Sequence, residues 1–228
     1  MKETVRETDL QRQREAMVER YKRMGYLHSE KIVEAMRRVP RELFMPYAYL
    51  EYAYHDQPFP IPGDGRQTIS APYTYAMFYE PLHLKRGDKV LEVGTGSGYG
   101  AALARELVGR TGKVVTIEVN VTTYRFGKGN LVKAGYHDII VICGDGSKGY
   151  PEEAPYDKIC VTAACPEIPK PLTKQLRTPG RIVAPVGGPS PLISQNLVLL
   201  SKDKNGKVTI ETLDRVVYVP LTGEYGWS

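Results

Sequence analysis

The residues best suited to chemistry form a short glycine-rich run with an acid just before it. Gly94, Gly96, Gly98 and Gly100 stand at alternate positions in "VLEVGTGSGYGAAL", which begins at Val90. A strand that passes through glycines into a helix brings bare backbone N–H groups close to a ligand, because no Cβ stands in the way. Pyrophosphate is one such ligand, and the adenosine and methionine parts of S-adenosylmethionine are another.

The acid before the glycine run favours the second ligand. The dinucleotide pattern GxGxxG fails from Gly94, because its sixth position is Tyr99, and a shifted match from Gly96 falls inside the expected helix. Glu92 stands two residues before the first glycine. A carboxylate there would repel a pyrophosphate and attract the ammonium of a methionine moiety, directly or through water.

Two further acids stand where predicted strands end. Glu118 follows Gly94 by 24 positions, where an acid can accept hydrogen bonds from both ribose hydroxyls. Asp145 lies between two glycines that leave room for a flat ring, and its carboxylate could accept from an adenine amino group. The alternatives are a solvated carboxylate for Glu118 and a turn-forming Asp for Asp145. All three acids meet at the rim where open α/β sheets bind ligands.

The elements that must position these acids alternate along the chain. Strands are expected over 88–93, 112–119, 138–146, 156–164 and 179–187, with helices over 98–109, 121–134 and 168–176 between them. Apolar strands that alternate with helices predict a mostly parallel, doubly wound sheet of the Rossmann-like α/β class. Helices over 4–24, 29–39 and 71–83 precede it, and two strands around Asn205-Gly206 predict a C-terminal antiparallel hairpin.

Composition excludes little and favours an ordinary globular protein. The formal charge of +5 comes from scattered basic residues, so a solvated surface is a better interpretation than nucleic-acid binding. Cys143, Cys160 and Cys165 have no CxxC spacing and lie in or beside apolar runs, which predicts buried free thiols. The isolated histidines suggest no metal site. No run reaches about 18 apolar residues, so we expect a cytoplasmic protein with no membrane partner. Oligomeric state is not readable.

Several motifs together resemble one enzyme family. The segments "QTISAP", "KVLEVGTGSGYGAAL", "GDGSKGYPEEAPYDKICVTAA", "PGRIVAPVG" and "VYVPLTGEYGW" look like protein-L-isoaspartate O-methyltransferase, over about Arg37 to Trp227. The resemblance implies a Rossmann-like fold and methyl transfer from S-adenosylmethionine to the free α-carboxylate of L-isoaspartyl residues in damaged proteins and peptides. The ester would then let a succinimide form again, which starts repair to normal aspartyl.

The resemblance also implies roles for individual residues. Ser70 corresponds to the family's catalytic serine, although it could also cap the helix that follows. Tyr73 stands where the family usually has histidine, so the task of that histidine is either done by a phenol or has moved. The predicted cofactor-binding residues are Gln67, Glu92, Gly94, Thr95, Gly96, Gly98, Glu118, Asp145, Gly146 and Thr222.

Three segments are expected, and three other functions stay open. Residues 1–66 form N-terminal helices with a Tyr/Pro-rich loop, 67–200 the cofactor-binding core, and 201–228 a hairpin strand and tail that complete the site. The alternatives are a methyltransferase for RNA or a small molecule, an NAD-dependent oxidoreductase, and a binding module without catalysis. The tyrosines of 47–54 have only acids and a histidine nearby, which argues against RNA.

Overall fold

The computed structural model describes residues 2–190 and 192–227, so the predicted segment ends at residues 1 and 228 lie outside it. The helices are α1 (Lys2–Met24), α2 (Glu30–Arg38), α3 (Pro72–Leu82), α4 (Tyr99–Val108), α5 (Val121–Lys133) and α6 (Lys170–Gln175). The strands are β1 (Phe59–Pro60), β2 (Thr68–Ile69), β3 (Lys89–Val93), β4 (Lys113–Glu118), β5 (Ile140–Cys143), β6 (Tyr156–Val161), β7 (Leu176–Val186), β8 (Gln195–Lys202) and β9 (Val208–Val216).

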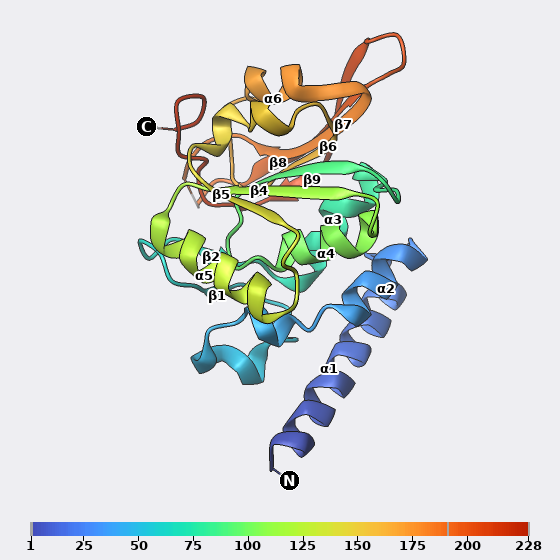
Figure 1. The fold of residues 1–228 in the computed structure, drawn as a ribbon, viewed down its shortest axis with the longest axis vertical. Coiled ribbons are helices and arrows are strands. Elements are labelled where there is room, and N and C mark those ends of the chain that lie inside the picture. Colours follow the sequence, from blue (N-terminus) through green and yellow to red (C-terminus); the bar gives the residue numbers. More distant parts are fainter. Residues whose placement is uncertain (1, 191, 228) are drawn as a thin grey trace.

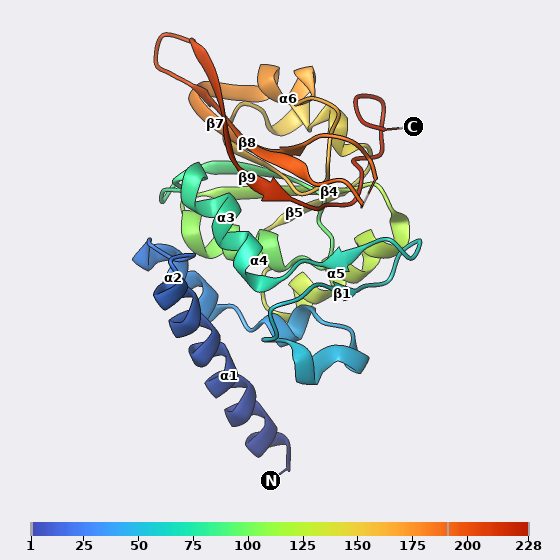
Figure 2. The same cartoon turned by 180° about the vertical axis from the view of Figure 1, so that it is seen from behind.

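Seven strands form one sheet in the order β5-β4-β3-β6-β7-β8-β9. The first five strands in this order, β5, β4, β3, β6 and β7, are parallel. Strands β8 and β9 add antiparallel pairs at the edge. Helices α3, α4 and α5 cover one face and α6 covers the other, which Figures 1 and 2 show from opposite sides. The predicted doubly wound sheet is confirmed. The strand order reverses between β3 and β6, where folds of this class bind ligands.

Burial on both faces explains the apolar strands. In β3, Leu91 and Val93 belong to the core on the α6 side, whereas Val90 belongs to the core on the α4 side. Successive side chains of a strand point to opposite faces, so Glu92 shares the α4 side with Val90. Glu92 therefore points into the interior from a strand whose residues Val90, Leu91 and Val93 are apolar.

The C-terminal hairpin forms at the predicted turn. Gly206 has φ +81°, and the Asp203 carboxylate accepts hydrogen bonds from the backbone N–H groups of Asn205 and Lys207. The hairpin begins at Gln195, so the predicted boundary between residues 200 and 201 falls inside β8. The division into three segments otherwise stays a prediction.

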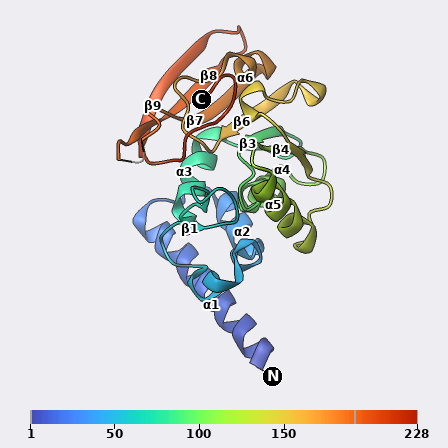
Figure 3. The same cartoon turned by 90° about the vertical axis from the view of Figure 1, so that its left-hand side faces the viewer.

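The N-terminal region packs beside α4 and α3. Helix α1 projects away from the sheet, as Figure 3 shows, while its C-terminal half buries Met17, Val18 and Tyr21. Arg37 of α2 binds Glu15 and Glu19 of α1. Within residues 2–190 and 192–227, no helix combines the length and apolarity needed to cross a bilayer.

One cysteine prediction is wrong. Cys160 and Cys165 are buried free thiols, but Cys143 is exposed. Cys143 is the last residue of β5, the edge strand on this side of the sheet, so its apolar neighbours in sequence do not bring it into the core.

Candidate active site

One cavity of about 300 Å³ opens at the carboxyl edge of the parallel strands. It collects residues from the β2–α3 junction, the β3–α4 loop, the end of β4 and the segment after β9. The predicted residues that line it are Gln67, Ser70, Glu92, Gly94, Thr95, Gly96, Glu118, Gly146 and Thr222. Gly98 and Asp145 are not among the lining residues. Volumes of this size are typical of small-molecule sites.

The glycine loop does not offer the bare N–H groups that we predicted. The N–H groups of Gly94 and Thr95 both donate to the carbonyl of Ile117, at 2.8 and 3.1 Å. The N–H of Gly96 donates to the Glu118 carboxylate at 3.0 Å. These donors are used to fasten the loop onto β4. The glycines therefore contribute room beside the cavity more than hydrogen bonds into it.

Both the backbone conformation at position 94 and the nearby Thr162 side chain require a glycine there. The φ of Gly94, +100°, lies in a region that residues other than glycine rarely adopt. A Cβ on Gly94 would also stand 2.3 Å from Oγ1 of Thr162. That Thr162 hydroxyl donates to the carbonyls of Val93 and Gly94, and it ties the β3 end to the β6 end.

Glu92 is a buried acid without a basic partner. It is 2% exposed, and its carboxylate accepts from the Thr116 hydroxyl at 2.8 Å. Thr116 is joined in turn to the Thr95 hydroxyl at 2.8 Å. Burial raises the pKa of Glu92 to about 8, against the lowering effect of the Thr116 hydrogen bond. No lysine, arginine or histidine pairs with it in the described part of the chain. A cation brought to this carboxylate would relieve the cost of ionising it.

Glu118 stands at the end of β4 with both oxygens held. One oxygen accepts from the Gly96 N–H at 3.0 Å and the other from the Asn120 N–H at 3.1 Å. Burial raises the pKa of Glu118, and these backbone donors oppose that shift. A carboxylate has about four acceptor positions, so each oxygen can take one more donor. The geometry suits a pair of adjacent hydroxyls.

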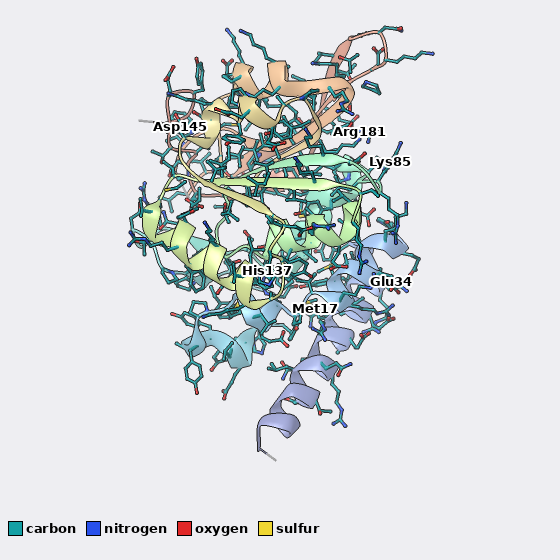
Figure 4. All side chains as sticks on the ribbon, viewed as in Figure 1. Met17, Glu34, Lys85, His137, Asp145 and Arg181 are labelled. Atoms are coloured by element: carbon teal, nitrogen blue, oxygen red, sulfur yellow. The ribbon has the colours of Figure 1, made fainter. Side chains whose placement is uncertain are left out.

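Asp145 is occupied by the protein itself. Its carboxylate accepts from the N–H and the hydroxyl of Ser147, at 2.9 and 2.6 Å, and from the N–H of Glu224 at 2.9 Å. Figure 4 places Asp145 at one end of the sheet, opposite Lys85 and Arg181. The contacts with Ser147 support the turn-forming alternative. The hydrogen bond from Glu224 also holds the C-terminal tail against this turn. An adenine contact stays a prediction, and the arrangement weighs against it.

Ser70 precedes α3 without capping it. The N-cap of α3 is Ala71, and no side chain caps that terminus. The capping alternative for Ser70 is therefore wrong. The Ser70 hydroxyl lies beside the hydroxyl of Tyr218, and its carbonyl accepts from the guanidinium of Arg41 at 2.7 Å. The serine is held by its backbone, and its side chain is directed to the cavity wall.

Gln67 and Thr222 line the cavity from two segments that are distant in the sequence. The side-chain oxygen of Gln67 accepts from the backbone N–H of Asp64 at 2.9 Å, which fixes the loop before β2. Thr222 lies in the tail and forms a bridge with Trp227, whose indole N–H donates to the carbonyl of Ala164 at 3.1 Å. The predicted third segment thus contributes directly to the cavity.

Tyr73 lies away from the cavity. Its ring stacks on Tyr26 with centroids 5.1 Å apart and meets Tyr21 edge-on at 6.4 Å. Tyr21 donates to Asp56 at 2.6 Å. At this position the aromatic ring joins the N-terminal helices to α3.

Sequence reasoning missed several lining residues. Tyr75, Tyr79 and Tyr218 line the cavity, and the Tyr79 hydroxyl donates to the carbonyl of Gly100 at 2.6 Å. The spacing of Tyr75 and Tyr79 is four residues, which places both on one helix face. This spacing could have predicted the two tyrosines from the sequence. Thr162, which also lines the cavity, could have been predicted from its position at the end of a strand.

Comparison with known proteins gives the family. The family model described as "Protein-L-isoaspartate(D-aspartate) O-methyltransferase (PCMT)" matches residues 12–226. The chain belongs to this family. A protein-L-isoaspartate O-methyltransferase 2 of Archaeoglobus fulgidus is 50% identical over 220 residues, which cover 96% of this chain and 97% of that protein. The protein-L-isoaspartate O-methyltransferase of Hyperthermus butylicus is 49% identical, over 94% of this chain and 90% of its own.

Solved structures agree with the family. A protein-L-isoaspartate O-methyltransferase structure has a TM-score of 0.83 and 32% identity, and the match covers 93% of this chain and 67% of that one. A putative family member from Plasmodium falciparum, in complex with S-adenosyl-L-homocysteine, has a TM-score of 0.79. It is 24% identical over 91% of this chain and 97% of its own, so this likeness shows the fold alone.

Proposed function

We propose that the carboxyl-edge cavity carries out the reaction of the family, in which S-adenosylmethionine donates its methyl group to the free α-carboxylate of an L-isoaspartyl residue. Family membership over residues 12–226 confirms the predicted enzyme class, substrate class and cofactor. The assignment of individual site residues is our own. It is supported by the convergence of Ser70, Glu92 and Glu118 on one cavity.

The residues present fit the cofactor. Glu92 is a buried carboxylate that lacks a cation, and Glu118 presents acceptor positions suited to adjacent hydroxyls. In the proposed arrangement Glu118 receives the ribose and Glu92 lies toward the cationic methionine end. Gly94 and Gly96 leave the space between them. When it is bound, S-adenosylmethionine supplies an activated methyl group on a sulfonium.

The protein has little acid–base chemistry to perform. The substrate carboxylate is already ionised at neutral pH, because an α-carboxyl group has a pKa of about 3.5. The Ser70 hydroxyl donates to one carboxylate oxygen and leaves the other free to attack. The hydroxyl of Tyr218 is a hydrogen-bond partner of that hydroxyl and keeps it in place. Alignment of the reacting atoms accounts for the acceleration in such a site.

The test uses a matched pair of peptides. The protein is incubated with labelled S-adenosylmethionine and either an isoaspartyl peptide or the same sequence with normal aspartate. We expect base-labile methyl ester on the isoaspartyl peptide only. Equal labelling of both peptides would refute the repair assignment, and competition by RNA would favour a nucleic-acid acceptor. The absence of nucleic-acid and membrane partners, and a cytoplasmic location, stay predictions.

Cofactor binding is expected to release a proton. At pH 7 a carboxyl with a pKa of about 8 is about nine-tenths neutral. A ligand ammonium near Glu92 favours the charged form and lowers its pKa, so affinity for S-adenosylhomocysteine should rise as the pH is raised from 6 to about 8. Calorimetry in buffers of different ionisation enthalpy measures the proton. Glu92→Gln should abolish its release, and an unchanged release in this variant would contradict the role of Glu92.

Two glycine substitutions separate local crowding from helix propensity. A Cβ on Gly100 would stand 2.2 Å from Oε1 of Glu92, whereas a Cβ on Gly129 of α5 meets nothing within 4 Å. Gly129→Ala should therefore stabilise the protein by about 0.5–1 kcal/mol without changing ligand affinity. Gly100→Ala should displace Glu92 and weaken S-adenosylhomocysteine binding by about tenfold or more. Thermal unfolding and ligand titration distinguish the two, and equal affinities would contradict the placement of Glu92.

A further inference from the structure

Arg41 is a fully buried guanidinium that reaches the proposed catalytic serine from behind. Its side chain is 0% exposed. Nε donates to the carbonyl of Ala53 at 2.8 Å, and Nη2 donates to the carbonyl of Ser70 at 2.7 Å. Through Nε and Nη2, the guanidinium thus joins the N-terminal loop to the β2–α3 junction. The remaining nitrogen, Nη1, is buried and has no hydrogen-bond partner among the described residues.

The hydrogen bonds that Arg41 donates to the backbone go to neutral carbonyl oxygens. In the part of the chain that the structure describes, no carboxylate forms an ion pair with it. The ring of Tyr99, 5.3 Å away, offers only its π-face. Tyr75, which lines the cavity, also interacts with the guanidinium. A buried unpaired charge is costly, and such a group in a native fold calls for an explanation.

We propose that Arg41 is a positioning residue that also supplies the electrostatic preference for a carboxylate at Ser70. This inference rests on the proposed function. The guanidinium fixes the main chain of Ser70. Because Nη2 contacts the Ser70 carbonyl oxygen, standard covalent dimensions place it within about 7 Å of the Ser70 hydroxyl. A substrate α-carboxylate bound to that hydroxyl comes close to this guanidinium, which has no ion-pair partner among the described residues. In a low-dielectric interior this attraction is strong and weakly screened by salt.

A second cation provides the natural control. Arg66 also lines the cavity, but it is exposed and its side chain pairs with Asp64 at 2.6 Å. If carboxylate recognition came from this mouth residue, salt would weaken it. Arg66→Gln therefore removes a charge of the same kind from the solvent side, and Arg41→Gln removes it from the interior.

The experiment measures a preference for charge instead of activity alone. With S-adenosylhomocysteine bound, affinities are measured for an isoaspartyl peptide and for the same peptide with an α-carboxamide in place of the α-carboxylate. We expect the wild type to prefer the carboxylate by about tenfold or more, and to keep that preference in about 0.5 M salt. Arg41→Gln should bring the ratio close to one, whereas Arg66→Gln should change it less than about twofold.

Further readouts distinguish this role from a purely structural one. Arg41→Lys keeps the charge and should keep the ratio, but kcat should fall at least about tenfold because an ammonium cannot hold two carbonyls in a planar fork. Affinity for S-adenosylhomocysteine and thermal unfolding report the fold of each variant. A wild-type ratio in folded Arg41→Gln would overturn the proposal. If that variant does not fold, loss of the wild-type preference in high salt overturns it. Failure of the proposed function would instead appear as no methylation of isoaspartyl peptide by the wild type.

Discussion

Ser70→Ala is expected to lower kcat by about 100-fold to 1,000-fold while affinity for S-adenosylhomocysteine changes less than twofold. The hydroxyl is proposed to hold the substrate carboxylate in line with the methyl group, and the loss of one well-placed donor typically costs this much. Because Ser70 does not cap α3, the substitution leaves the helix terminus intact. Steady-state kinetics with an isoaspartyl peptide and ligand titration measure the two quantities.

The matched control is Ser190→Ala. Ser190 lies half-buried in the loop between β7 and β8, and its hydroxyl accepts a hydrogen bond from the N–H of Leu192 at 3.2 Å. Turnover of this variant should equal that of the wild type. If Ser70→Ala keeps wild-type turnover, the hydroxyl is not part of the reaction and alignment must come from elsewhere.

Glu118→Gln is expected to weaken S-adenosylhomocysteine binding by about 10-fold to 100-fold. The substitution replaces a charged acceptor by a neutral one in two hydroxyl hydrogen bonds, and the charge contributes about 1 kcal/mol to each of them. It also turns an amide N–H₂ toward the N–H of Gly96 or of Asn120. Isothermal titration measures the change.

A ligand without ribose hydroxyls separates these two causes. The wild type should lose affinity for a 2′,3′-dideoxy analogue of S-adenosylhomocysteine, whereas Glu118→Gln should show little further loss. Glu153→Gln is the control variant, because Glu153 pairs with Lys113 and Lys89 at the amino ends of β4 and β3. Equal losses for the dideoxy analogue in wild type and Glu118→Gln would place the ribose elsewhere.

Strand ends were predictable because their pattern is local. The apolar runs before Glu92 and Glu118 are buried on both faces of the sheet, and such runs read clearly in a single sequence. The hairpin around Asn205-Gly206 was predictable for the same reason, since its turn chemistry lies within a few residues. Both acids therefore reached the cavity as expected.

Contacts between distant segments were not predictable. Asp145 binds the N–H of Glu224, 79 positions further along the chain, and nothing near Asp145 signals that the tail returns there. The N–H groups of Gly94 and Thr95 are satisfied by the carbonyl of Ile117, which depends on how the loop closes onto the neighbouring strand. From the segment "VPRELF" alone, Arg41 would be interpreted as an ordinary surface charge. Only the fold brings the carbonyls of two other segments to its guanidinium.

The measurement that tests the account most directly is a crystal structure of the protein with S-adenosylhomocysteine. We expect both ribose hydroxyls within hydrogen-bond distance of Glu118, the methionine ammonium toward Glu92, and the sulfur facing the Ser70 hydroxyl across the cavity. A ligand bound outside this cavity, or bound inside it with its sulfur turned away from Ser70, would contradict the account.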